Sequence, residues 1–302
     1  MPLIRPYPPE APTDPDMAVF GSPRPGYAEL LLRVLAISGY GMWMWLGMAL
    51  ALGVERIGQD DMQMPLLLGI ALVSADGLLA ALQQSVAHDD RARGRHRRRW
   101  SVRAVGLFVA TLVPVVLVIS LGDGHGHSTV LRLAGVAMML CSLVSLVYSA
   151  HRYRHQHSSG LRGVSASLPA SRLVTAWYIG GLWVWMCTML QGGQQAPGGA
   201  YAWILLLLAL ALLLGLLEGM RWQMLGVGHE RNGGRDTTPL QPLRFLAAIF
   251  VYLLPCAALL LTERFGGGVL AAVLSVPSAL FGKMLEQQVY ERALAGGGYS
   301  VA

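Results

Sequence analysis

Four ionisable side chains interrupt long apolar segments that are otherwise almost free of charge: Asp76, Glu218, Lys283 and Glu286. Charged groups are costly in hydrocarbon and usually face the interior of a helix bundle, where they mark ion or proton pathways. Asp76 lies near the centre of its segment, where a hydrogen-bonded helix contact and a proton or quinone role are both open. For the other three, we expect interfacial positions, with snorkelling or local pairing of Lys283 with Glu286.

A polar stretch follows the segment that contains Asp76. It begins LQQSVAHDDRAR and includes His88 and Arg91. Polar groups that converge at a membrane boundary could hydrogen-bond a quinone carbonyl. Alternatively, they simply end a helix at the lipid headgroups.

The eight histidines and three cysteines form no recognisable cofactor site. No histidine lies in the middle of an apolar segment, so a pair of axial haem ligands on facing helices is not expected. The tracts GDGHGHS (122–128) and HRYRHQH (151–157) could hold a metal ion, but polar loops explain them as well. The cysteines lack CxxC spacing. We therefore expect no metal site and no tightly bound cofactor.

Motifs of the common catalytic folds are also missing from the sequence. There is no P-loop, GxSxG elbow, HExxH helix or Rossmann fingerprint in a suitable context. No soluble insert is large enough to hold an active site. If the chain takes part in an enzyme reaction, the catalytic centre is expected on another chain.

The apolar segments themselves predict an all-α polytopic membrane protein. Hydrophobic residues make up 54% of the chain and charged residues 13%, about half the usual share of a soluble domain. A helix needs about 20 mainly apolar residues to span a bilayer. Eight segments satisfy this, and we expect a bundle of eight transmembrane helices within 27–302. The predicted spans are 27–53, 64–87, 102–121, 130–150, 173–190, 201–220, 245–261 and 265–289.

The loops between these spans predict the orientation. Three alternate loops are rich in arginine, at 91–99, 152–172 and 231–244, whereas the opposite loops contain only Arg56 and Arg264. The positive-inside rule places the basic loops and both termini in the cytoplasm. Residues 1–26, with eight prolines, are expected to form a cytoplasmic tail. The net charge of +6 is explained by topology, and no nucleic-acid partner is expected.

Small residues recur at helix-packing intervals in two spans. Gly39, Gly41 and Gly47 lie in the first span, and Gly215 and Gly219 form a GxxxG motif in the sixth. Such residues allow helix backbones to approach closely in lipid. We expect a closely packed bundle.

Three local motifs resemble the membrane anchor subunits of dimethyl sulfoxide reductase–type molybdoenzymes, which have eight spans in roughly this length. SVAHDDRA at the end of the second span is similar to the family's Ser-x-x-His motif and its following basic residues. LVYSA ends the fourth span, where the family has a tyrosine-containing helix end. FGKMLEQQVYERA resembles the family's Glu-Arg-x-Leu-Phe-Phe ending. The chain departs from the family at Asp89, Asp90 and Gln287, and it lacks the family's acidic quinol-site residue after the next loop.

The resemblance implies a membrane anchor for an iron–sulfur electron-transfer subunit and a molybdopterin catalytic subunit, in the bacterial inner membrane. Electrons would pass between the clusters and an exchangeable menaquinol or ubiquinol. His88 matches the family's quinol-site histidine and Arg91 a nearby basic position, while Glu286 and Tyr290 fall on motif positions. With Asp76, these residues are the candidate quinone-binding set.

Two other functional classes remain open. A membrane scaffold or assembly protein without redox activity would use the proline-rich tail and basic loops for docking. A small-solute or ion transporter could use Pro114, Pro255 and Pro277 to interrupt helices, but no convincing sequence repeat relates the two halves.

Overall fold

The computed structural model describes residues 26–53, 59–86, 94–121, 128–156, 168–191, 197–231, 241–265 and 268–296. Within these ranges every element is helical. The elements are α1 (Tyr27–Ala51), α2 (Gln59–Val86), α3 (Gly94–Leu121), α4 (Ser128–Gln156), α5 (Leu168–Leu190), α6 (Pro197–Arg231), α7 (Gln241–Ala248), the π-helix η4 (Ile249–Leu253), α8 (Leu254–Phe265) and α9 (Gly268–Gly296). The expected tail, residues 1–25, lies outside the described residues.

The helices have the length and composition of membrane spans. Six helical stretches of the described chain are long and apolar enough to cross a bilayer. Helices α2 and α3 contain shorter apolar stretches, Gln63–Leu79 and Val105–Ser120. Large apolar side chains such as Leu212 and Phe245 are exposed on the outside of the bundle, as expected for a surface that faces lipid. The all-helical, multi-pass architecture expected from the sequence is confirmed.

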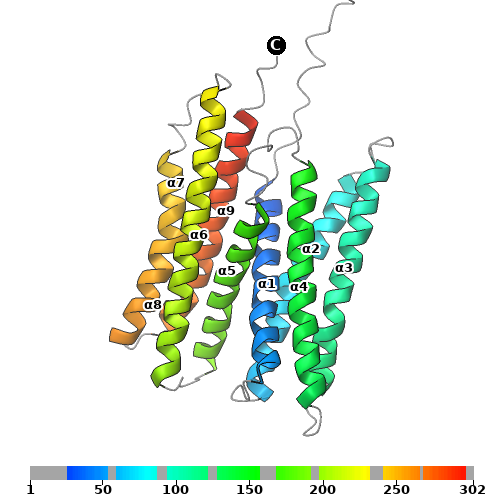
Figure 1. Ribbon diagram of the computed structural model, residues 1–302, viewed down its shortest axis with the longest axis vertical. Helices are drawn as coiled ribbons and strands as arrows, with labels where there is room; N and C mark the ends of the chain where they lie inside the picture. Colours follow the sequence, from blue (N-terminus) through cyan, green and yellow to red (C-terminus); the bar gives the residue numbers. More distant parts are fainter. Residues whose placement is uncertain are drawn as a thin grey trace, which may run out of the picture.

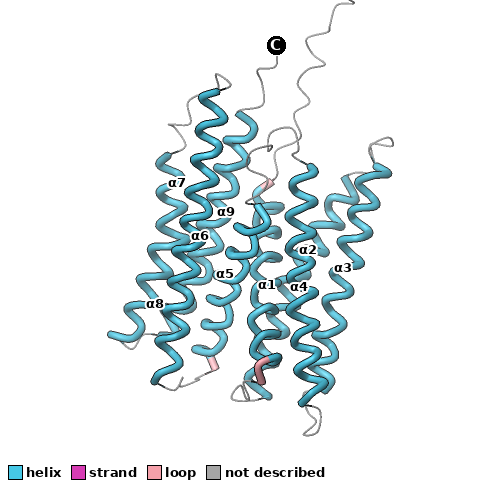
Figure 2. The backbone as a smooth tube through the Cα atoms, viewed as in Figure 1, coloured by secondary structure: helices cyan, strands magenta, loops and turns pink. Residues whose placement is uncertain are grey.

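The bundle consists of two halves that meet at α1 and α5 (Figures 1 and 2). One apolar core joins α1–α4 and receives residues of α5, whereas the other joins α5, α6, α8, η4 and α9 and receives Val34 of α1. Helix α1 is buried along most of its length between α2, α4 and α5. This central position explains why α1 carries so many small and aromatic residues.

Glycines allow α1 to contact its neighbours closely. A Cβ added to Gly41 would overlap the backbone of Ala176 on α5, and one added to Gly180 would overlap the backbone at Gly41. Only hydrogen fits at such a crossing. The GxxxG of α6 behaves differently, because nothing in the described chain lies within 4 Å of a Cβ added to Gly215 or Gly219. The prediction of close helix packing is therefore confirmed at Gly41. Within the described chain, it is wrong at Gly215 and Gly219.

Helices α7 and α8 form one continuous helix with a π-turn just before Pro255. Proline has no N–H, so the carbonyl of Val251, four residues earlier, loses its helical partner. The hydroxyl of Tyr178 on α5 donates to this carbonyl at 2.9 Å. Within η4, the Leu254 N–H donates to the Ile249 carbonyl, the wider spacing of a π-helix. Pro255 thus alters the helix without breaking the span.

Two short motifs recur at corresponding places of the halves. The first helix of each half carries Gly-x-Trp-x-Trp, at 41–45 in α1 and 181–185 in α5. The second helix of each half carries an acid followed by glycine, Asp76-Gly77 in α2 and Glu218-Gly219 in α6. In each half, the acid accepts a hydrogen bond from a hydroxyl of the first helix, from Tyr40 to Asp76 and from Ser171 to Glu218.

Candidate functional site

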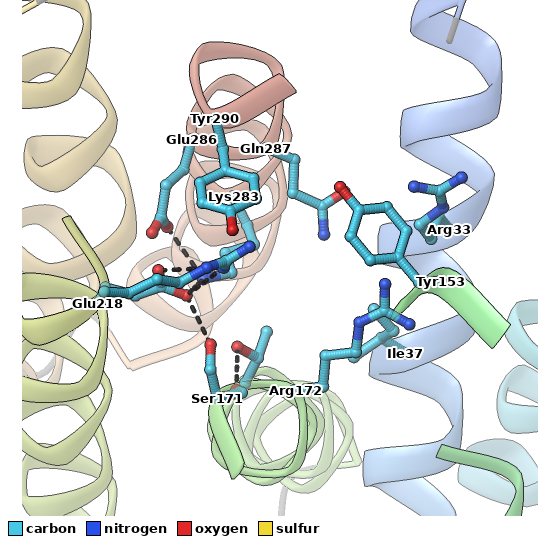
Figure 3. A pocket seen from close by; sticks show the side chains of 12 residues that line it. Arg33, Ile37, Tyr153, Ser171, Arg172, Glu218, Lys283, Glu286, Gln287 and Tyr290 are labelled. Carbon is cyan, nitrogen blue, oxygen red and sulfur yellow. Dashed lines mark hydrogen bonds and ion pairs between the residues drawn. The ribbon is translucent and has the colours of Figure 1, made fainter. Parts of the chain in front are cut away.

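A small polar cavity lies between the two halves of the bundle. It is near the end where α1 and α5 begin and α4, α6 and α9 end (Figures 1 and 3). Its volume is about 30 Å³. Twelve residues line it: Arg33, Ile37, Tyr153, Ser171, Arg172, Thr175, Glu218, Arg221, Lys283, Glu286, Gln287 and Tyr290. We call this the charged pocket.

Lys283 lies at the centre of one side of the charged pocket. Its Nζ is 2.8 Å from Glu218 Oε1 on α6 and 3.0 Å from Glu286 Oε2 on its own helix. Glu218 Oε1 also accepts a 2.6 Å hydrogen bond from Ser171 Oγ on α5. Only 4% of Lys283 and 5% of Glu218 are exposed. Buried charges persist only when they are paired and hydrogen-bonded, and these groups satisfy both conditions.

Arg221 and Tyr290 complete this side of the pocket. Arg221 Nη1 lies 3.3 Å from Glu218 Oε2, one turn earlier on α6. Its guanidinium carbon lies 3.5 Å from the centre of the Tyr290 ring, a cation–π contact. Trp222 packs edge-on against the same ring. Tyr290 of α9 is thereby held between two residues of α6.

The opposite side contains two arginines around an aromatic ring. The guanidinium carbons of Arg33 and Arg172 lie 5.1 Å and 4.7 Å from the centre of the Tyr153 ring. The Tyr153 hydroxyl donates to Glu291 Oε1 at 2.6 Å. Burial and the neighbouring Glu291 carboxylate raise the pKa of Tyr153 well above its ordinary value, so the phenol stays protonated. Arg33 pairs with Glu29 at 2.9 Å and with Glu291 at 3.7 Å.

The cations that line the pocket outnumber the acids that line it, and they are unevenly paired. Arg33, Arg172, Arg221 and Lys283 line it with Glu218 and Glu286, whereas Glu29 and Glu291 pair with Arg33 outside the lining. Arg172 has no carboxylate within ion-pair distance among the described residues. Its one hydrogen bond there runs from Nη1 to Ser149 Oγ, at 3.3 Å.

Several buried polar atoms of the pocket have no hydrogen-bond partner among the described residues. They are Gln287 Oε1, the Tyr290 hydroxyl and Arg221 Nε. Buried polar groups are normally satisfied by protein or by ordered water. One water needs about 10–15 Å³ of such space, so the cavity accommodates about two or three water molecules. An aromatic ring does not fit in it.

The residues predicted to bind quinone fall into three groups. Glu286 and Tyr290 line the charged pocket together. Asp76 lies in the other half, where its Oδ2 accepts a 3.1 Å hydrogen bond from Tyr40, and it does not line the pocket. His88 and Arg91 lie outside the described residues, as do Asp123, His125, His127 and His157 of the histidine tracts.

Only part of this arrangement is predictable from the sequence. The pairing of Lys283 with Glu286 is present, but the side chains point into the bundle rather than out to the headgroups (Figure 3). Arg172 belongs to a predicted arginine-rich loop, whereas it lies in α5 and lines the pocket. No sequence motif predicts a role for Arg33 or Tyr153. One feature of the sequence does indicate the pocket. Arg33, Glu218 and Lys283 all lie toward the predicted cytoplasmic end of their apolar segments.

No family model, curated protein or solved structure matches the chain.

Proposed function

We propose that this chain is the membrane anchor subunit of a respiratory molybdoenzyme complex. In this role it exchanges electrons between a quinone pool and an iron–sulfur subunit, and the charged pocket handles the accompanying protons. The observation that carries the proposal is the position of Glu286 and Tyr290. These two residues, which fall on the family's motif positions, lie together in a buried network of ionisable side chains.

Quinol chemistry requires a proton acceptor near the membrane surface. Oxidation of a quinol to a quinone releases two electrons and two protons. The electrons pass to the clusters of a partner subunit, and the protons need basic groups that reach water. Glu286 is suited to this task because Lys283, 3.0 Å away, stabilises its carboxylate after a proton has left. Proton transfer by a positioned side chain typically accelerates a reaction about 10²–10⁴-fold.

Because the pocket is small, the quinone ring and the protons released from the quinol would occupy different places. Because a cavity of about 30 Å³ holds only water, the quinone ring would bind outside it, between the bundle and lipid. His88 and Arg91 follow the C-terminal end of α2, which lies at the same end of the bundle as the pocket (Figure 1). We propose them as ligands of the ring and Glu286 as the proton acceptor behind it.

We also propose how many times the chain crosses the membrane and on which side its termini lie. The chain would cross the bacterial inner membrane eight times, with α2 and α3 as the two spans whose apolar stretches are shorter. Both termini would be cytoplasmic, by the distribution of arginine. The charged pocket would then open toward the cytoplasm, where iron–sulfur and molybdopterin subunits would dock.

One observation favours a second candidate, a proton-coupled transporter of a small solute. The pocket lies between two helical halves that share short motifs, and many transporters bind their substrate between such repeats. In that case Arg172, which has no carboxylate partner among the described residues, would bind an anionic group of the solute.

Purification from native membranes distinguishes the two candidates. The anchor should copurify with two larger proteins, and the preparation should contain molybdenum and several iron atoms per chain. A transporter should purify alone and free of both metals. Metal-free protein from membranes of cells grown under several respiratory conditions would contradict the anchor proposal.

A further inference from the structure

A second series of ionisable residues connects the charged pocket with the end of the bundle. Tyr153 lines the pocket, and its hydroxyl donates to Glu291 at 2.6 Å. Glu291 lies 3.7 Å from Arg33, which also binds Glu29 at 2.9 Å. Glu29 belongs to the first turn of α1, at the end of the bundle (Figure 1).

The acidic side chains of the pocket and of this series differ in exposure. The side chain of Glu218 is 6% exposed, those of Glu286 and Glu291 are each 13% exposed, and that of Glu29 is 31% exposed. Glu286 and Glu291 are thus equally exposed, and the exposure rises from Glu291 to Glu29, at the end of the bundle.

The cavity separates this series from the network of Glu218, Lys283 and Glu286 on the other side of the charged pocket. Glu286 lines one side of it and Tyr153 the other (Figure 3). Within the described chain, Gln287 Oε1, a hydrogen-bond acceptor, has no donor. The Tyr290 hydroxyl also has no hydrogen-bond partner there. Tyr290 is only 3% exposed. A water molecule both donates and accepts, so it satisfies both groups, which an inorganic anion or cation alone would not.

We propose that Tyr153 and Glu291 form a water-linked proton passage from Glu286 to the aqueous phase, with Glu29 at its exit. This inference rests on the proposed function and assigns the direction in which that site releases its protons. A proton leaves the Glu286 carboxyl for a cavity water, and the carboxylate remains beside Lys283. The water passes a proton to the Tyr153 oxygen while the phenol proton moves to Glu291. Glu291 then releases the proton to bulk water past Glu29.

Two features determine the role of each residue. The Tyr153 phenol keeps its proton at neutral pH, so it takes part only by gaining one proton as it loses another, which makes it a proton relay between the cavity water and Glu291. Arg33 pairs with both Glu29 and Glu291 and holds them at the exit. Arg172 stacks on Tyr153 and fixes its ring.

The passage is tested by infrared hydrogen–deuterium exchange on the purified chain in lipid nanodiscs. The band to follow is the protonated-carboxyl band that disappears in Glu286→Gln. After transfer to D₂O, we expect Tyr153→Phe to shift this band about 100-fold more slowly than the wild type. The phenylalanine retains the ring against which both arginines stack. Glu291→Gln should have a similar effect. Tyr178→Phe, which removes a buried hydroxyl that does not line the pocket, should exchange at the wild-type rate.

Wild-type exchange rates in both Tyr153→Phe and Glu291→Gln would overturn the passage. So would the absence of any Glu286-dependent band over the pH range in which the protein remains folded. The experiment needs neither quinone nor partner subunits, so its outcome is independent of whether the chain copurifies with a molybdoenzyme.

Discussion

Glu218 and Lys283 are 65 residues apart in the sequence, yet their side chains form a 2.8 Å ion pair inside the bundle. The pair joins α6 to α9, and Ser171 extends it to α5. It therefore fixes three helices of the second half around the charged pocket. Through Glu286, the same lysine connects this structural pair to the group that we propose as proton acceptor.

Removal of the Lys283 charge should destabilise the protein strongly. Lys283→Met keeps most of the side-chain volume but leaves two buried carboxylates without their shared cation. Breaking a buried pair in this way costs about 3–5 kcal/mol. Unfolding of the detergent-solubilised protein by denaturant measures the change. Adding Glu218→Gln should recover part of the loss, because the two residues are coupled. A loss below about 1 kcal/mol would show that the pair contributes little.

The crossing of α1 and α5 should tolerate no side chain at Gly41. Gly41→Ala places a methyl group against the Ala176 backbone, which cannot move aside as a side chain can. We expect a loss of about 1–3 kcal/mol or more in the free energy of unfolding. Gly215→Ala is the matched control, because its Cβ meets open space, and its stability should stay within about 1 kcal/mol of wild type. Equal effects of both changes would contradict the assigned crossing.

The proposed orientation is tested by reporter fusions. Fusions after Gly160 and Gly234 should report a cytoplasmic location, and fusions after Gly124 and Gly198 a periplasmic one. The reason is the arginine content of the loops that contain Gly160 and Gly234. A periplasmic result at Gly160 would reverse the orientation and place the charged pocket at the outer surface.

His88 should matter for quinol binding, whereas His96 should not. If His88 donates to or accepts from a quinone oxygen, His88→Ala should reduce quinol-linked turnover of the intact complex about 100-fold. Electron transfer from an artificial dye should persist in the same preparation. His96→Ala, further along the arginine-rich stretch, is the control. Equal and mild effects of both changes would mean that His88 only ends a helix.

The fold was largely predictable because the bilayer imposes a minimum apolar length on each span. The predicted spans lie within or close to the observed helices, but the helices extend beyond them. Helix α3 begins at Gly94, eight residues before the predicted start of its span at 102, because arginine-rich sequence can remain helical outside the hydrocarbon. Apolar length alone does not detect such extensions.

The site was less predictable because it depends on how helices rotate against one another. The spacing of Lys283 and Glu286 is local, so their pairing could be inferred from one helix. The contact between Lys283 and Glu218 requires the relative positions of α6 and α9, which the apolar pattern does not determine. Asp76 drew attention because of its depth in an apolar segment, yet its Tyr40 partner lies outside the charged pocket.

The most direct test of the account compares Glu286→Gln with wild type in the purified complex. Glutamine retains the shape of the side chain and removes its ability to carry a proton. Quinol-linked turnover should fall about 100-fold or more, while dye-linked turnover by the catalytic subunit should stay near the wild-type rate. Glu263→Gln, in α8 at the opposite end of the bundle, should leave both rates unchanged (Figure 1). Quinol-linked turnover at the wild-type rate in Glu286→Gln would contradict the assignment of the charged pocket to proton transfer.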